Sequence, residues 1–108
     1  MSVSSILYQM KIAQARRVFE RAKRESGTRY FGVENVTMKG LRRWSIAPVT
    51  PHKAIDALKG VDRAPLPPHL VTVWDSGKHA WRTLDLSTVR RIYWRGADNV
   101  KREYAFAG

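Results

Sequence analysis

Apolar side chains recur every three or four residues near the start of the chain, which is the spacing of one face of a helix. The positions that form this stripe are Tyr8, Ile12, Ala15, Phe19 and Ala22. Ser4 or Ser5 can cap the start of such a helix, and Ser26-Gly27 supplies a stop. The pattern therefore predicts an amphipathic helix over residues 4–24.

The opposite surface of this predicted helix is basic. It carries Lys11, Arg17, Arg21 and Arg24, with Arg16 and Lys23 at its edges. Only Glu20 and Glu25 interrupt it. The simpler interpretation is a helix face that is exposed to solvent. The excess of basic over acidic residues makes binding of a polyanion an equally good interpretation.

After Gly27 the helical spacing gives way to short runs rich in aromatic and β-branched residues, which are typical of strands. Five runs are predicted as strands: 29–37, 41–47, 70–74, 80–86 and 90–94. A turn at 38–40 joins the first two, a turn at 75–79 joins the next two, and a single 3₁₀ turn is expected at 87–89. Closing five short strands into a small barrel would remove the edges that an open sheet exposes.

All five prolines lie within residues 48–69, so this stretch is not a central strand. Within it, His52–Lys59 could form a short helix, with Pro51 near its start and Gly60 after its end. We interpret the stretch as a long loop inside one domain, because neither flank is large enough to hold a core alone. The predicted organisation is a basic helix at 1–28, a mainly β barrel at 29–96 with its Pro-rich loop at 48–69, and a C-terminal tail at 97–108.

The second half of the predicted barrel carries an unusual ordered set of residues. Within Val71–Ile92 they are Trp74-Asp75, a turn, Trp81-Arg82-Thr83, the spaced pair Leu84 and Leu86, and Arg90. This segment resembles the second half of a WYL domain, and it is similar to a family of small Src-homology-like barrel proteins common in bacteriophages. The resemblance covers residues 29–95 and implies a five-stranded Sm-like barrel. For WYL domains it also implies binding of nucleic acid or nucleotide-like ligands through a basic patch, commonly in a transcriptional regulator or a defence-system accessory.

Three features depart from the WYL pattern. The positions that give the family its name are Pro68, His69 and Leu70 here, so that only the leucine matches. Asp85 stands where the family has a basic residue. The winged helix-turn-helix that usually precedes a WYL domain has no counterpart, because residues 1–28 predict one helix. The ligand preference is therefore not carried over from the family.

Charge points to the class of partner. Lys and Arg number 20 and Asp and Glu number 9, so the formal net charge is +11. The excess positive charge repels itself and opposes a compact fold, unless a polyanion neutralises it. Nucleic acid is the commonest polyanionic partner. Cysteine is absent, which excludes disulfides, thiolate zinc sites and cysteine nucleophiles. No apolar run is long enough for a signal peptide or a membrane span, so we expect a cytoplasmic protein. The resemblance to WYL domains and phage barrel proteins implies that the cell is bacterial or phage-infected.

Catalytic chemistry finds little support in the sequence. His52, His69 and His79 are far apart and lack the spacing of metal ligands. There is no glycine-rich phosphate loop, and no pair of carboxylates is placed for acid–base work. We therefore expect a protein that is not an enzyme and that has no cofactor and no metal site.

Binding is better supported, because cations and aromatic side chains alternate in several short clusters. Single-stranded nucleic acid is held by a basic groove together with aromatic faces on which bases stack. The candidate nucleic-acid-binding residues are Arg17, Arg21, Arg24, Arg43, Lys78, Trp81, Arg82, Arg90, Arg91, Tyr93 and Arg95. About four to six phosphate contacts would make affinity steeply salt-dependent. Sequence selectivity should be low, since no major-groove recognition helix is evident.

Strand alternation sorts the densest cluster into two faces. Ile92 and Trp94 are expected to point inward, and the outward row is Arg91, Tyr93 and Arg95. By the same rule Trp81 lies on the exposed side of its strand, opposite the core residues Leu84 and Leu86. One tyrosine between two arginines could stack a base while both neighbours meet phosphates.

Two other functions remain open. The chain could be a phage protein-interaction module that binds and modulates a host protein through the apolar stripe of Tyr8, Ile12 and Phe19. The same helix could mediate formation of a homo-oligomer. Binding of the basic helix to a membrane surface ranks last, because two alanines in the stripe would bury little in a bilayer.

Overall fold

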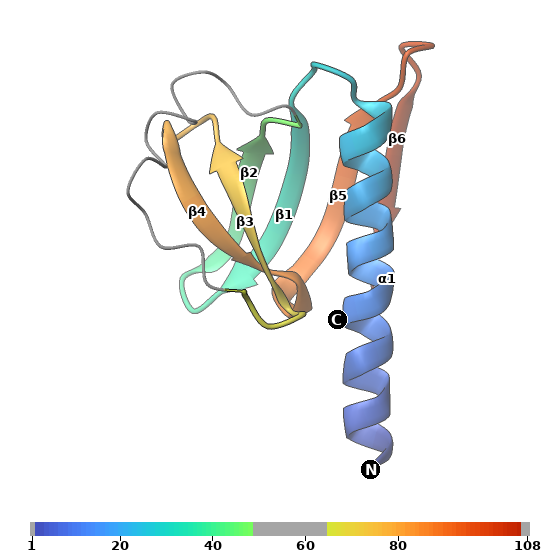
Figure 1. The fold of residues 1–108 in the computed structure, drawn as a ribbon, viewed down its shortest axis with the longest axis vertical. Coiled ribbons are helices and arrows are strands. Elements are labelled where there is room, and N and C mark those ends of the chain that lie inside the picture. Colours follow the sequence, from blue (N-terminus) through green and yellow to red (C-terminus); the bar gives the residue numbers. More distant parts are fainter. Residues whose placement is uncertain (1, 49–64, 107–108) are drawn as a thin grey trace.

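The computed structural model describes residues 2–48 and 65–106, and Figure 1 shows their arrangement. In this part of the chain one long helix precedes six antiparallel strands. The elements are α1 (Val3–Glu25), β1 (Phe31–Thr37), β2 (Gly40–Ile46), β3 (Leu70–Asp75), β4 (Ala80–Asp85), the 3₁₀ helix η1 (Leu86–Thr88), β5 (Val89–Arg95) and β6 (Lys101–Ala105). The strands form one sheet in the order β4-β3-β2-β1-β5-β6. The predicted helix at His52–Lys59 lies outside the described residues.

α1 begins slightly earlier than predicted, because its N-cap is Ser2 and not Ser4 or Ser5, and Ser26 is its C-cap. The Ser2 side chain accepts a hydrogen bond from the Ser5 backbone N–H, and Gly27 follows the last turn with φ of 63°. The buried side consists of Ile12, Ala15, Phe19 and Ala22, which all belong to the predicted stripe. Tyr8, the remaining member, is exposed, because the N-terminal turns of α1 extend past the end of the sheet (Figure 1).

One face of the sheet, the inner face, is turned toward α1 and forms the core. Phe19 of α1 packs edge-on against Phe31 of β1, with 5.4 Å between the ring centroids. Ile92 and Trp94 are buried on this face, as strand alternation predicts. Trp44 is buried beside them, and its indole N–H donates to Oδ1 of Asn35 at 2.8 Å. The one polar atom of this large ring is therefore not left without a partner.

The prediction of a closed five-stranded barrel is wrong, because the sheet is open and has six strands. The additional strand is β6, in the stretch predicted as a tail. It pairs with β5 from Arg91↔Ala105 to Arg95↔Lys101 and so occupies the edge of β5 that closure would require. β4, at the other end of the sheet, pairs with β3 alone among the described strands.

The sheet also turns sharply between β2 and β3. These two strands share a single residue pair, Ile46↔Asp75, whereas β1 and β2 pair along their whole length. Ser76 extends the junction, since its backbone N–H and its hydroxyl both donate to the carbonyl oxygen of Ser45. As a result β3 crosses in front of β2 in Figure 1, while β5 and β6 lie to the side next to α1.

Candidate nucleic-acid interface

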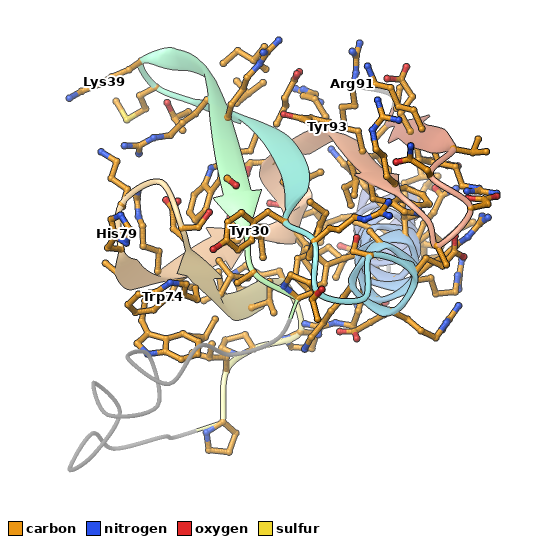
Figure 2. The ribbon with its side chains drawn as sticks, turned by 90° about the horizontal axis from the view of Figure 1, so that it is seen from above. Tyr30, Lys39, Trp74, His79, Arg91 and Tyr93 are labelled. Carbon is orange, nitrogen blue, oxygen red and sulfur yellow. The ribbon has the colours of Figure 1, made fainter. Side chains whose placement is uncertain are left out.

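The face of the sheet opposite α1, which we call the outer face, collects basic and aromatic side chains from four neighbouring strands. Register places Gly32 between Ser45 and Tyr93, and it places Glu34 between Arg43 and Arg91. On β6, Lys101 lies opposite Arg95 and Glu103 lies opposite Tyr93. Figure 2 looks along α1, and in it Arg91 and Tyr93 lie on the side of β5 that faces away from the helix.

Tyr93 rests directly on the backbone of Gly32. A Cβ atom built at Gly32 would lie 2.1 Å from both Cε2 and Cζ of the tyrosine ring. Such a distance is far inside van der Waals contact, so the ring can lie there only because position 32 has no side chain. The pairing of Gly32 with Tyr93 thus holds an aromatic ring down on the surface of the sheet.

A groove of about 280 Å³ adjoins this ring. Its lining includes Arg29, Tyr30, Gly32, Tyr93, Arg95 and Lys101. Tyr30 is 61% exposed, and Figure 2 shows it where β1 begins and β2 ends. Two tyrosines beside three cations provide the two kinds of contact that a single strand needs, namely stacking surfaces for bases and charges for phosphates.

The charges of the outer face are predominantly positive. Glu34 is buried beneath its neighbours, and its Oε1 lies 3.3 Å from Nε of Arg43, whose side chain is exposed. Arg91 and Glu103 are 3.9 Å apart and both partly exposed, so this ion pair is weak. Among the described residues, Arg29, Arg43, Arg91, Arg95 and Lys101 therefore face two carboxylates. The excess of cations suits a polyanionic ligand.

Hydrogen bonds fix two of these arginines at the rim of the groove. Arg95 Nη1 donates to the carbonyl oxygen of Asn99 at 3.0 Å. Arg29 Nη1 donates to the carbonyl oxygen of Gly96 at 3.0 Å and to Oδ1 of Asn99 at 3.3 Å. Their remaining N–H groups are still available, because a guanidinium has five donors.

The helix candidates lie on a different side of the molecule. Arg17 and Arg24 are exposed on α1, which covers the inner face. Arg21 pairs with Glu25 at 2.7 Å and lies 5.5 Å from the ring centre of Trp94. The hydrogen bonds that Arg21 and the Trp94 indole donate hold the pKa of Glu25 below its usual value. Arg21 is thus already engaged within the protein.

The predicted binding residues on β3, β4 and the turn between them lie apart from the basic and aromatic side chains of the outer face. Arg82 is partly buried on the inner face, where it pairs with the buried Asp75 at 3.3 Å and lies 4.7 Å from the ring centre of Trp44. Trp81 is half-buried and packs edge-on against Trp74, with 5.7 Å between centroids. Lys78 is exposed in the turn between β3 and β4.

Arg90 also lies away from the outer face. It is half-buried at the point where the register of β1 and β5 shifts, between Glu34↔Arg91 and Asn35↔Val89. Burial, followed by the charge of Arg90, lowers the pKa of Lys11 on α1, which indicates that Arg90 lies near the helix. The shift keeps both Val89 and Ile92 in the core.

Of the predicted residues, the structure therefore brings together Arg43, Arg91, Tyr93 and Arg95. It adds Arg29, Tyr30, Gly32 and Lys101, which sequence reasoning did not select. The detectable signal was Gly32, since a glycine inside a strand often marks a close approach of another group. Lys101 had no such signal, because its strand was not predicted.

In residues 2–48 and 65–106, no three His, Cys, Asp or Glu side chains gather where they could hold a metal ion. Over the same ranges, no helix has the length and apolar character needed to cross a membrane.

Comparisons of the chain with protein-family models, with curated proteins and with solved structures find no match in any of the three. The resemblance of Val71–Ile92 to WYL domains accordingly stays a prediction from the sequence.

Proposed function

We propose that this protein binds single-stranded nucleic acid on the outer face of its sheet, with low sequence specificity and without catalysis. The observation that supports this most is the groove where Tyr93 lies on Gly32, next to Tyr30 and among Arg29, Arg95 and Lys101. Bases stack on the tyrosine rings while phosphates contact the surrounding cations.

The shape of the surface favours a single strand over a duplex. Bases in a duplex are stacked on each other, so their faces are not available to a tyrosine ring, whereas a single strand can present them. Within residues 2–48 and 65–106, no helix lies on the outer face where it could enter a major groove. Stacking tolerates every base, which accounts for the low specificity.

The sequence also allowed a module that binds a host protein through the apolar stripe of Tyr8, Ile12 and Phe19. Such a module would need another surface. Ile12 and Phe19 of that stripe are buried in the core, and only Tyr8 is exposed. We therefore keep nucleic-acid binding as the primary proposal. On the resemblance to WYL and phage barrel proteins, we further propose that the protein is a regulatory or accessory factor in the cytoplasm of a bacterial or phage-infected cell.

The proposal is tested by fluorescence anisotropy with labelled single-stranded DNA, single-stranded RNA and duplex DNA of equal length, across a series of salt concentrations. We expect single strands to bind more tightly than the duplex, and we expect affinity to fall steeply with salt. Whichever of single-stranded DNA and single-stranded RNA binds with the higher affinity is the ligand class of the protein. Binding no tighter than that of a basic peptide of equal charge would contradict the proposal.

Tyr93 provides the matched variants for this assay. Tyr93→Leu removes the stacking surface and should weaken binding by about 1–3 kcal/mol, which is roughly 5- to 150-fold in Kd. Tyr93→Phe keeps the ring and should bind within about twofold of the wild type. Equal losses in both variants would mean that the hydroxyl group, and not stacking, carries the contact.

A further inference from the structure

α1 carries a second apolar stripe on the side opposite the core. Its members are Val3, Ile6, Leu7 and Met10, which follow the spacing of one helix face. Val3 is nine residues from Ile12, Ile6 is nine from Ala15, and Met10 is nine from Phe19. Nine residues are about two and a half helical turns, so each of these pairs lies on opposite sides of α1.

This stripe is exposed to solvent. Val3 is 72% exposed, Leu7 59% and Met10 60%, and the N-terminal turns that carry them extend past the end of the sheet (Figure 1). The stripe borders a groove of about 540 Å³, which Lys11, Gln14 and Arg17 line together with Leu7, Met10, Ala13 and Phe106. An exposed row of apolar side chains on one face of a helix is typical of a site that receives another helix.

The distribution of charge along the chain indicates which protein supplies the partner helix. Residues 1–10 contain no charged side chain, although the whole chain has a formal net charge of +11. Two copies of this protein repel each other over most of their surfaces, and the uncharged end of α1 is where they approach at the lowest electrostatic cost. A strongly acidic partner, by contrast, would meet no basic side chain over residues 1–10, whereas the rest of the chain offers 20 lysines and arginines.

Charge also selects the direction of pairing. Beyond Met10 the same side of α1 continues through Arg17, Arg21 and Arg24. Parallel helices would bring these arginines of two copies together, whereas antiparallel helices place the uncharged ends over each other and the arginines outside the contact. Antiparallel packing also gives the self-complementary interface of a two-fold dimer.

We propose that two copies of the protein associate through antiparallel packing of the N-terminal halves of α1, which buries Val3, Ile6, Leu7 and Met10 of each copy. This association is independent of nucleic-acid binding, because the stripe lies on α1 and the tyrosine groove on the opposite side of the sheet. The overlap is short, so the dimer dissociates on dilution.

Two methionine variants test the proposal. Met10→Lys places a charge in the contact, while Met38→Lys makes the same change at the fully exposed tip of the β1–β2 turn. Neither residue is in the core, so both variants should fold. In sedimentation experiments over a range of concentrations, we expect the wild type and Met38→Lys to approach twice the monomer mass of 12.4 kDa and Met10→Lys to remain a monomer. A monomeric wild type, or a Met10→Lys that associates as well as Met38→Lys, would overturn it.

The direction of packing has its own test, because the chain contains no cysteine. In an antiparallel pair, Val3 of one copy lies near Met10 of the other. A mixture of Val3→Cys and Met10→Cys proteins should therefore form disulfide-linked dimers that contain one copy of each. Efficient cross-linking of Val3→Cys to itself, with no preference for the mixed dimer, would contradict the antiparallel arrangement.

Discussion

Tyr93 can lie on the sheet only because residue 32 is glycine, so a single methyl group should disturb the proposed site. In Gly32→Ala the new Cβ overlaps the ring, and the ring must swing away from the strand. We expect this variant to bind single-stranded nucleic acid about as weakly as Tyr93→Leu, in the same anisotropy assay. The double variant should lose little more than either single one, because both remove the same contact.

The contradicting result for Gly32→Ala would be wild-type affinity in a folded protein. Its thermal unfolding should be recorded alongside the binding curve, since alanine is otherwise better tolerated than glycine within a strand. A folded variant with unchanged affinity would mean that the position of the Tyr93 ring does not matter for binding.

Arg82 illustrates a residue whose structural partners suggest a role different from the one predicted. Sequence reasoning placed it among the binding residues, whereas the structure pairs it with the buried Asp75 and stacks it on Trp44. Arg82→Ala leaves the Asp75 carboxylate with fewer partners, and we expect a loss of about 2 kcal/mol in the free energy of unfolding. Chemical denaturation measures this loss.

Nucleic-acid affinity distinguishes a structural role of Arg82 from a role in binding. If its role is structural, the folded Arg82→Ala protein should retain nucleic-acid affinity within about threefold, because one distant cation is lost. A stable variant with strongly reduced affinity would instead support the role first predicted from the sequence.

At the scale of elements, the helix and the first five strands could be predicted because each buries a periodic set of apolar residues. α1 has Ile12, Ala15, Phe19 and Ala22 against the core, and β5 alternates buried Ile92 and Trp94 with outward side chains. β6 has no such pattern. Three of its residues are Lys101, Arg102 and Glu103, and most of its side chains are exposed, so hydrogen bonding to β5 defines it. That pairing depends on a partner strand and cannot be read from five residues alone.

The turn between β5 and β6 is stabilised by charge, which gives a prediction for the effect of pH. Hydrogen bonds from Arg102, and then from the Val100 backbone N–H, hold the pKa of Asp98 well below its ordinary value of 3.8. A pKa that is lowered in the folded state contributes stability above the unfolded value, and this contribution is lost as pH falls. Asp98 therefore stabilises the turn at neutral pH and less so in acid.

Asp98→Asn tests this contribution. We expect the variant to unfold at a lower temperature than the wild type at neutral pH, and we expect the difference to narrow progressively below about pH 4. Circular dichroism during heating measures both proteins at each pH. A difference that is the same at neutral and acidic pH would show that the charge of Asp98 is not its cause.

At the scale of the whole molecule, topology decides which predicted residues can act together. The sequence clusters of cations and aromatics looked equivalent, yet β1, β2, β5 and β6 gather some of them on the outer face while α1 carries others to the opposite side. Arg43 and Arg91 are far apart in sequence and become neighbours of Glu34 through strand pairing. Such long-range pairing is invisible to local patterns, which is also why barrel closure was expected where β6 prevents it.

Two double variants of equal charge show whether the outer face binds nucleic acid. Arg91→Gln with Arg95→Gln removes two outer-face cations, and Arg17→Gln with Arg24→Gln removes two exposed cations of α1. Both lower the formal net charge of +11 by the same amount, so any difference reflects position. In anisotropy titrations with a single-stranded oligonucleotide, we expect the outer-face variant to lose affinity by tenfold or more, on the order of two charge-assisted contacts, and the helix variant by less than about threefold. Equal losses, or a larger loss in the helix variant, would mean that the outer face is not the surface that binds nucleic acid.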